Sequence, residues 1–325
     1  MGASFTPGAD FEGSFINHIE STWAPVLWHG LFMAVTGLVV GLGIVKGIGR
    51  AVKFLMPALF ILVVLLAIRG VTLEGASEGL RFYLMPNFSD LSWQTLLVAA
   101  GQAFFSLSLG MGAIITYGSY MNKNDEVLSS AAWVVVLDVV IALLAGFAIF
   151  PAVFALGFAP DSGPGLAFIT LPAVFSAMPF GSFFAAIFFL FLSLAALTSA
   201  ISLLEVVVSW FVDEKNVPRL KATLLMVFFI FLLGIPASLS MGAVDISLFG
   251  IPFFDLLDGL QEKILLPLGG LLTVLFAAYV YKANVTREKS NTGANHIVLV
   301  VLFEYLLKYV MPVAIIIILI AGFIF

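Results

Sequence analysis

Long apolar stretches separated by short polar segments run along the whole chain. A helix of roughly 20 apolar residues crosses a hydrocarbon core about 30 Å thick, and about eight stretches reach that length. The predicted spans are residues 25–45, 54–73, 95–121, 127–157, 182–212, 222–241, 256–281 and 297–325. The pattern therefore predicts an all-α polytopic membrane protein with about eight transmembrane helices.

Two segments outside these spans have a different pattern. Residues 161–181, DSGPGLAFITLPAVFSAMPFG, contain too much Gly and Pro for a span, so we expect a re-entrant or surface segment with a short helix that caps one mouth of the bundle. The first residues, MGASFTPGADFEGSF, lack the basic start and apolar core of a signal peptide. We expect them to form a loop.

The basic residues indicate the orientation in the membrane. Ten of the fourteen lie in alternate connections: Lys46, Arg50, Lys53, Lys123, Lys215, Arg219, Lys221, Lys282, Arg287 and Lys289. The opposite connections clearly hold only Arg69 and Arg81. Because cytoplasmic loops carry an excess of Lys and Arg, the first set is predicted to be cytoplasmic, which places both termini outside.

Composition supports a membrane protein and excludes several other classes. The chain is 62% hydrophobic and only 10% charged, and it has no Cys, which excludes disulfides and thiolate metal sites. No segment is basic enough to predict nucleic-acid binding. No HExxH or P-loop motif occurs, and we expect no enzyme activity and no ATP hydrolysis by this chain. Energy for any transport must come from an ion gradient or a partner.

The stretch SLSLGMG, residues 106–112, interrupts a predicted span. Gly and Ser also occur where transmembrane helices pack closely, so helix packing is one interpretation. The other is a broken helix, because Gly inside a helix costs roughly 1 kcal/mol and Ser can bond freed backbone groups. Unwound backbone inside a membrane is tolerated where it lines a cavity or a ligand, which makes this stretch a candidate cation or substrate site.

Two further sets of polar residues lie inside predicted spans. Asp138 is costly there unless it is paired, protonated or bound to a cation, although a hydrogen-bonded structural role is also possible. Ala195, Thr198, Ser199 and Ser202 follow the helical repeat and form one small, hydroxyl-bearing face. That face could serve close helix packing or offer oxygen ligands to a monovalent metal ion, and spacing alone does not decide between them.

Four segments together resemble a known family. In order they are GQAFFSLSLGMGAIITYGSYM, LAGFAIFPAVFALG, GPGLAFITLPAVFSAMPFG and LAALTSAISLLEVVVSW. They closely resemble the bacterial branch of the neurotransmitter:sodium symporter family, and the likeness extends from about Trp28 onward. It implies a LeuT-type inverted-repeat fold and sodium-coupled symport of an amino acid or similar small zwitterion by alternating access in the cytoplasmic membrane. Na+ would be the coupling ion.

The resemblance also implies a domain plan, with residues 1–325 as one transporter domain. Its spans match helices four to eleven of the family: residues 1–24 would be an external loop remnant, 25–73 the last two helices of the first repeat, 95–281 the second repeat and 297–325 an additional helix. The first three helices and the twelfth have no counterpart, so an incomplete form is expected. The alternative is a non-transporting fragment, or a half-transporter that needs a separate N-terminal polypeptide as partner; a channel is a further alternative.

The likeness assigns roles to individual residues. The implied substrate contacts are Phe105, Ser106, Ser108, Met111, Ser199 and Leu203. The implied sodium ligands are Ser106 and Asp138 at a first site, and Ala195, Thr198 and Ser199 at a second. Asp258 matches an external gate, and Asp213, Ser119 and Tyr120 match a cytoplasmic gate. Gln102 lies where chloride-dependent relatives bind the anion, and the fixed charge of Asp138 predicts that no chloride is required.

Overall fold

The computed structural model describes residues 9–43, 47–122, 125, 127–157, 163–281 and 304–324. Within these residues, six helices are long and apolar enough to cross a membrane. They are Ala24–Gly41, Gly49–Val71, Ser129–Ala155, Gly181–Asp213, Arg219–Leu239 and Phe253–Val280. Each coincides with a predicted span. The span predicted at 95–121 is divided into two helices, and only part of the span predicted at 297–325 is described.

The chain separates into two compact units. Unit 1 comprises Met1–Pro86 and Val139–Phe254, and unit 2 comprises Asn87–Asp138 and Asp255–Phe325. Helix α7 (Val127–Ala155) contributes to both. The division does not test the predicted repeat boundaries, which stay a prediction.

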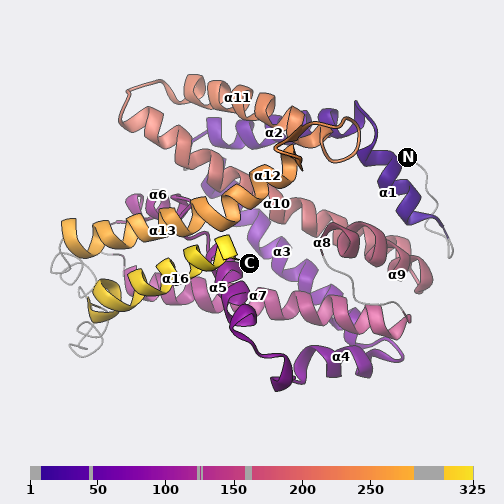
Figure 1. The fold of residues 1–325 in the computed structure, drawn as a ribbon. Coiled ribbons are helices and arrows are strands. Elements are labelled where there is room, and N and C mark those ends of the chain that lie inside the picture. The colour runs from indigo at the N-terminus through magenta and orange to yellow at the C-terminus, as the bar shows by residue number, and fades with distance from the viewer. Residues whose placement is uncertain are drawn as a thin grey trace. The chain divides into compact units, whose positions relative to one another are not determined.

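Unit 1 is built around the longest helix, α10. The elements of this unit besides α7 are α1 (Phe11–Ile19), α2 (Ala24–Gly41), α3 (Gly49–Val71), α4 (Ala76–Leu84), α8 (Gly163–Gly165), η3 (Leu166–Thr170), α9 (Leu171–Ala177), α10 (Gly181–Asp213), α11 (Arg219–Leu239) and the two-stranded hairpin β1 (Ser247–Leu248) and β2 (Ile251–Pro252). Helix α10 packs against α2, α3, α9 and α11, and α2 lies along α11 (Figure 1).

Unit 2 consists of shorter helical pieces. They are η2 (Phe88–Asp90), α5 (Trp93–Ser106), α6 (Ala113–Ser119), α12 (Phe253–Leu260), η4 (Gln261–Leu265), α13 (Leu266–Leu275), η5 (Phe276–Val280), η6 (Leu306–Val310) and α16 (Met311–Ile324). Helix α13 packs against α16 and α5 (Figure 1). A π-helical turn, η4, interrupts the long helix that begins with α12, and a second one, η5, ends it.

The Gly- and Pro-rich segment does contain the predicted short helix, α9. Pro172 stands in its first turn, where a missing N–H costs nothing, and the helix ends at Ala177. Val174 is fully buried and Phe175 nearly so, and both belong to an apolar cluster that includes Phe188 of α10. Burial of this apolar face holds the segment against α10.

The N-terminal segment differs from the expected loop. The loop predicted at the start of the chain is wrong for Phe11–Ile19, which form α1; the Asp10 side chain caps that helix by accepting a 2.7 Å hydrogen bond from the Gly13 amide. The orientation stays a prediction. Several of the basic residues on which it depends lie outside the described residues, namely Lys46, Lys123, Lys282, Arg287 and Lys289.

Arg219 joins three helices of unit 1. Its Nε donates a 2.9 Å hydrogen bond to the Val40 carbonyl near the end of α2, and its guanidinium pairs with the Glu205 carboxylate of α10. Glu205 is fully buried beside an apolar cluster that includes Ile201 and Leu204. A carboxylate there requires a cation, because an unpaired buried charge carries a large desolvation penalty. Arg219 therefore fixes the start of α11 against α2 and α10.

Replacing Arg219 by Met keeps most of the side-chain volume but leaves the Glu205 carboxylate buried without its cation. We expect Arg219→Met to lower the free energy of unfolding by about 3–5 kcal/mol, measured by unfolding in mixed detergent micelles. Lys221→Met is the matched control: this lysine is exposed, and its replacement is expected to change stability by less than about 0.5 kcal/mol. Equal stability of the two variants would contradict this role of the ion pair.

Candidate functional site

The helix predicted to break at SLSLGMG is broken in the structure. Helix α5 ends at Ser106 and α6 begins at Ala113. Between them Ser108, Gly110 and Gly112 have positive φ angles of 54°, 81° and 83°, a left-handed backbone that glycine adopts without steric penalty. The Leu109 amide donates a 2.9 Å hydrogen bond back to the Phe104 carbonyl, which closes the end of α5. The structure thus has the predicted break.

The break is packed against the backbone of α13 in the same unit. A Cβ atom on Gly110 would overlap the Leu266 carbonyl oxygen, and a Cβ on Gly269 would overlap the Gly110 carbonyl oxygen. The adjacent Gly270 makes room for the Phe104 ring. Both sides of this contact therefore require glycine. Sequence reasoning missed the α13 side, although its signal is visible as LPLGG, residues 266–270.

Ser106 and Asp138 meet at the end of α5. The Ser106 hydroxyl donates a 2.6 Å hydrogen bond to Oδ1 of Asp138, which projects from α7. Asp138 is only partly exposed, although its neighbours Leu137 and Val139 are exposed. The hydroxyl oxygen and the carboxylate keep lone pairs that can coordinate a cation. The structure thus brings together the two side chains predicted for the first sodium site.

The other residues predicted around the break lie on α5 or in the unwound segment. Phe105 is 48% exposed, and Ser108 and Met111 are half-buried. Gln102 is exposed on α5, one turn before Ser106. Their positions are compatible with ligand contacts, but no contact in the structure tests these roles.

The predicted hydroxyl face lies on α10 in unit 1. The Thr198 hydroxyl donates a 2.8 Å hydrogen bond to the Ala195 carbonyl, and the Ser202 hydroxyl donates a 3.0 Å bond to the Thr198 carbonyl. Such bonds satisfy the hydroxyl donors locally and leave oxygen lone pairs available. Ser199 is exposed, and one turn farther Leu203 is 45% exposed. The face is thus partly accessible, and both interpretations of it stay open.

The predicted gate residues lie near helix ends. Asp213 is the last residue of α10 and is exposed. Ser119 ends α6 and donates a 2.7 Å hydrogen bond to the Thr116 carbonyl, while the Tyr120 ring lies 6.4 Å from that of Tyr117. Asp258 is exposed on α12. These positions are consistent with the predicted roles without testing them.

The available ligands suit an alkali-metal ion. Across the described part of the chain, no group of three His, Cys, Asp or Glu side chains could hold a metal ion. Hydroxyl and carbonyl oxygens with a single carboxylate remain, as at Ser106 and Asp138. Hard oxygen ligands of this kind match a hard cation better than a transition metal.

Comparisons with known proteins agree on one family. The model of the sodium:neurotransmitter symporter family matches residues 19–325. The Bacillus subtilis (strain 168) protein named uncharacterized sodium-dependent transporter YhdH is 42% identical over 313 residues, which are 96% of this chain and 68% of that protein. An uncharacterized sodium-dependent transporter of Haemophilus influenzae is 41% identical, over 93% of this chain and 66% of its own length. The chain thus spans about two thirds of these relatives.

A solved structure is also similar. The crystal structure of MhsT in complex with L-phenylalanine matches with a TM-score of 0.88 and 40% sequence identity. The match covers 98% of this chain and 73% of that one. At this identity, the likeness extends to sequence as well as fold.

The contact between Gly110 and α13 generates a direct test. Gly110→Ala should destabilise the protein by about 2 kcal/mol or more, because the new methyl group overlaps the Leu266 carbonyl and alanine is strained at positive φ. Gly101→Ala on α5 is the control, since a Cβ there meets nothing within 4 Å and alanine favours a helix. Thermal unfolding in detergent compares the two. A Gly110→Ala protein as stable as Gly101→Ala would disprove the close packing.

Proposed function

Because this chain belongs to the sodium:neurotransmitter symporter family, we propose that it takes part in sodium-coupled symport of an amino acid or a similar small zwitterion. The family consists of secondary transporters, and this chain is a multi-pass membrane protein with their LeuT-type fold. Its relatives are sodium-dependent transporters, so Na+ is the coupling ion.

One observation carries the proposal: the hydrogen bond between Ser106 and Asp138 beside a helix break. An ionised Asp inside an apolar span is expensive, and a bound cation offsets that expense. The break adds the carbonyl dipoles of residues 107–111 and the amide dipoles of residues 110–112, which an intact helix would use internally. The Asp138 carboxylate of α7 thus meets the Ser106 hydroxyl where the backbone unwinds at the end of α5. This combination supports a first sodium site formed by Ser106 and Asp138.

A second sodium site is proposed on α10. Its ligands would be the Ala195 carbonyl and the hydroxyl oxygens of Thr198 and Ser199. The Thr198 hydroxyl already approaches the Ala195 carbonyl at 2.8 Å, so two of the three oxygens lie close together. All three oxygens belong to α10.

The substrate is proposed to be an amino acid with an apolar side chain. In unit 2, Phe105, Ser106, Ser108 and Met111 would contact it, with polar backbone for the zwitterionic end and Met111 for the side chain. For Ser199 and Leu203 of α10, a substrate contact is proposed from the family resemblance alone. The similar MhsT structure is a complex with L-phenylalanine, which supports an apolar substrate.

Transport would proceed by alternating access without chloride. The Asp138 carboxylate supplies a fixed negative charge, so an anion beside Gln102 is not needed for charge balance. Asp258 would act at the external gate, and Asp213, Ser119 and Tyr120 at the cytoplasmic one. Each positive charge moved inward gains about 2.3 kcal/mol per 100 mV of membrane potential. That energy would drive uptake against a substrate gradient.

Uptake into vesicles tests this function. With the protein expressed from its full reading frame and reconstituted in vesicles, we expect accumulation of labelled L-phenylalanine or another apolar amino acid only with an inward sodium gradient. Replacing external sodium by potassium should abolish accumulation, and replacing chloride by gluconate should leave it unchanged. Accumulation that is indifferent to sodium would refute the proposal, and loss in gluconate would refute the chloride-independent version.

Asp138→Asn tests the carboxylate directly. The change keeps the shape and a hydrogen-bond acceptor for Ser106 but removes the charge that attracts Na+. We expect the sodium concentration for half-maximal substrate binding to rise about tenfold or more, because interactions with a charged group contribute about 1.5–3 kcal/mol. Asp255→Asn, at an exposed acid of α12, is the control and should not change it. An unchanged sodium dependence in Asp138→Asn would exclude Asp138 as a ligand.

A further inference from the structure

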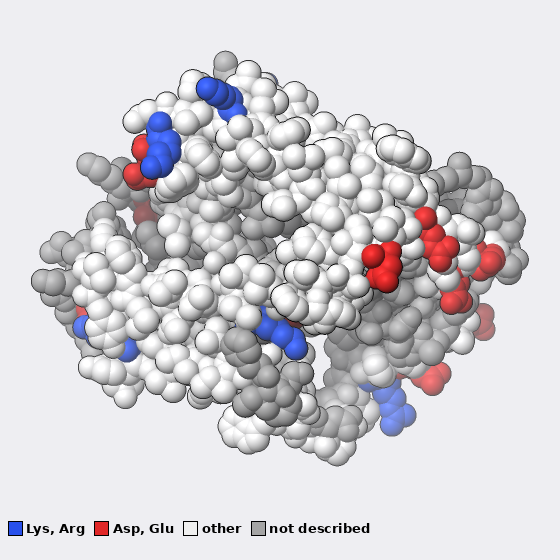
Figure 2. All heavy atoms as spheres, turned by 45° about the horizontal axis from the view of Figure 1, so that its top comes forward, with Lys and Arg blue, Asp and Glu red and all other residues white. Residues whose placement is uncertain are grey.

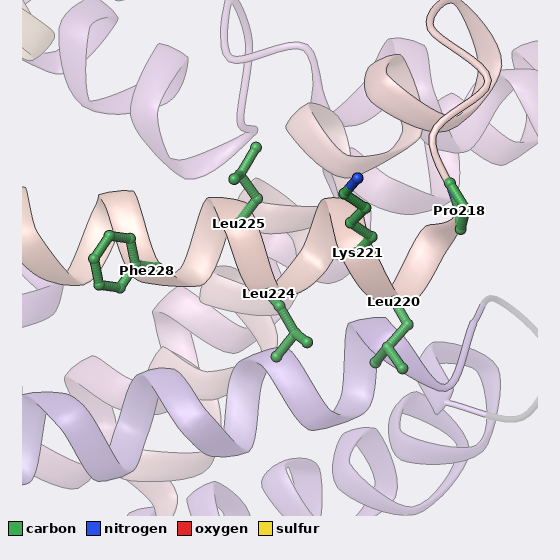
Figure 3. A pocket seen from close by; sticks show the side chains of 6 residues that line it. All are labelled: Pro218, Leu220, Lys221, Leu224, Leu225 and Phe228. Atoms are coloured by element: carbon green, nitrogen blue, oxygen red, sulfur yellow. The ribbon is translucent and has the colours of Figure 1, made fainter.

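A groove runs along the exposed face of α11 in unit 1. Its volume is about 570 Å³, and it is lined by Pro218, Leu220, Lys221, Leu224, Leu225 and Phe228 (Figure 3). The leucines and Phe228 are between 42% and 62% exposed. The opposite face of the helix is covered: Ala222 and Thr223 are buried, and Gly37 of α2 lies against Val227. The groove is therefore a surface feature of a helix whose other side is packed.

The groove has one charged residue, at its Pro218 end (Figure 3). Two other cations in the same stretch are engaged, since Arg219 pairs with Glu205 and the Lys215 ammonium lies 5.2 Å from the centre of the Trp210 ring. Lys221 is exposed and has no ion-pair partner among the described residues. Lys221 thus offers a positive charge at one end of the apolar groove.

We propose that this groove binds one anionic phospholipid, with the phosphate at Lys221 and an acyl chain over Leu224, Leu225 and Phe228. Seven residues separate Lys221 from Phe228, which is about 10 Å of helix and matches the upper part of an acyl chain. The predicted orientation places Lys221 at the cytoplasmic side, where anionic lipids attract basic residues. A positive charge followed by an apolar surface matches a phospholipid, in which a charged headgroup is followed by an apolar acyl chain.

Charge favours a lipid over a second copy of the chain. A symmetric dimer through this face would pair each groove with itself, because a two-fold interface uses the same patch on both partners. Lys221 of each copy would then lie in an apolar contact without an acidic residue from the groove lining. Most of the described residues in Figure 2 are uncharged; Lys and Arg form small separate groups, and most of the visible Asp and Glu gather toward one side. A lipid phosphate neutralises Lys221 and a second copy does not.

A fluorescent reporter in the groove tests the proposal. The 325-residue chain contains no Cys, so Leu224→Cys can carry a single small fluorophore, and Leu233→Cys, about 13 Å farther along α11, serves as the matched reporter. The two leucines are 62% and 63% exposed. The measurement in vesicles is the mole fraction of brominated lipid that quenches half of the Leu224→Cys fluorescence. We expect this mole fraction to be about fivefold lower for phosphatidylglycerol than for phosphatidylcholine, because one lysine near an anionic surface contributes about 1 kcal/mol. The Leu233→Cys reporter should not distinguish the lipids.

Charge variants then separate the possible outcomes. Lys221→Gln should abolish the preference at Leu224→Cys, whereas Lys221→Arg and Lys53→Gln, at an exposed lysine of α3, should retain it. Equal quenching by both lipids, or a preference that survives Lys221→Gln, would overturn the proposal. A reporter protected from both lipids, together with cross-linking between two Leu224→Cys chains, would show that a second copy covers the groove instead.

Discussion

The structure depends on one constraint of the membrane interior, where every polar group must find its partner within the protein. The break between α5 and α6 takes backbone amides and carbonyls out of their helical bonds. It is stable because glycines let two backbones meet: Gly110 lies against Leu266, and Gly269 lies against the Gly110 carbonyl. That contact packs the unwound segment against α13 in unit 2.

The same constraint explains the charged residues inside unit 1. Glu205 is the buried acid of α10, and it is held by Arg219, whose second bond goes to the Val40 carbonyl. The pair spans three helices, so the charge is compensated by tertiary contacts and not by its own helix. Asp138 in unit 2 differs, because its partner is a neutral hydroxyl. A carboxylate that is incompletely neutralised by protein is the one suited to a cation that must bind and leave.

Structure and proposed function are linked through this difference. The fully paired Glu205 and Arg219 stabilise the fold, whereas Ser106 and Asp138 meet beside a break whose backbone is available for a ligand. Lys221 shows a third arrangement, a cation at the surface whose proposed partner is the lipid itself. In each case the surroundings of a charged side chain decide whether it stabilises the fold, binds an ion or contacts lipid.

The sequence by itself determined the membrane class and most of the span positions, because apolar length is a local property. Span 182–212 and helix α10, Gly181–Asp213, agree closely for this reason. The Gly and Ser residues of the sequence indicated the break at residues 106–112 as one of two interpretations, and the resemblance of four segments indicated the family. The resemblance implied that Ser106 and Asp138 lie together, and only the tertiary structure showed that they bond directly and that Gly110 meets Leu266. The bond from Ser106 to Asp138 joins positions 32 residues apart, and the contact of Gly110 with Leu266 joins positions far more distant. Periodicity cannot predict such partners, because it reports the environment of a residue along its own helix and not the identity of the neighbouring helix.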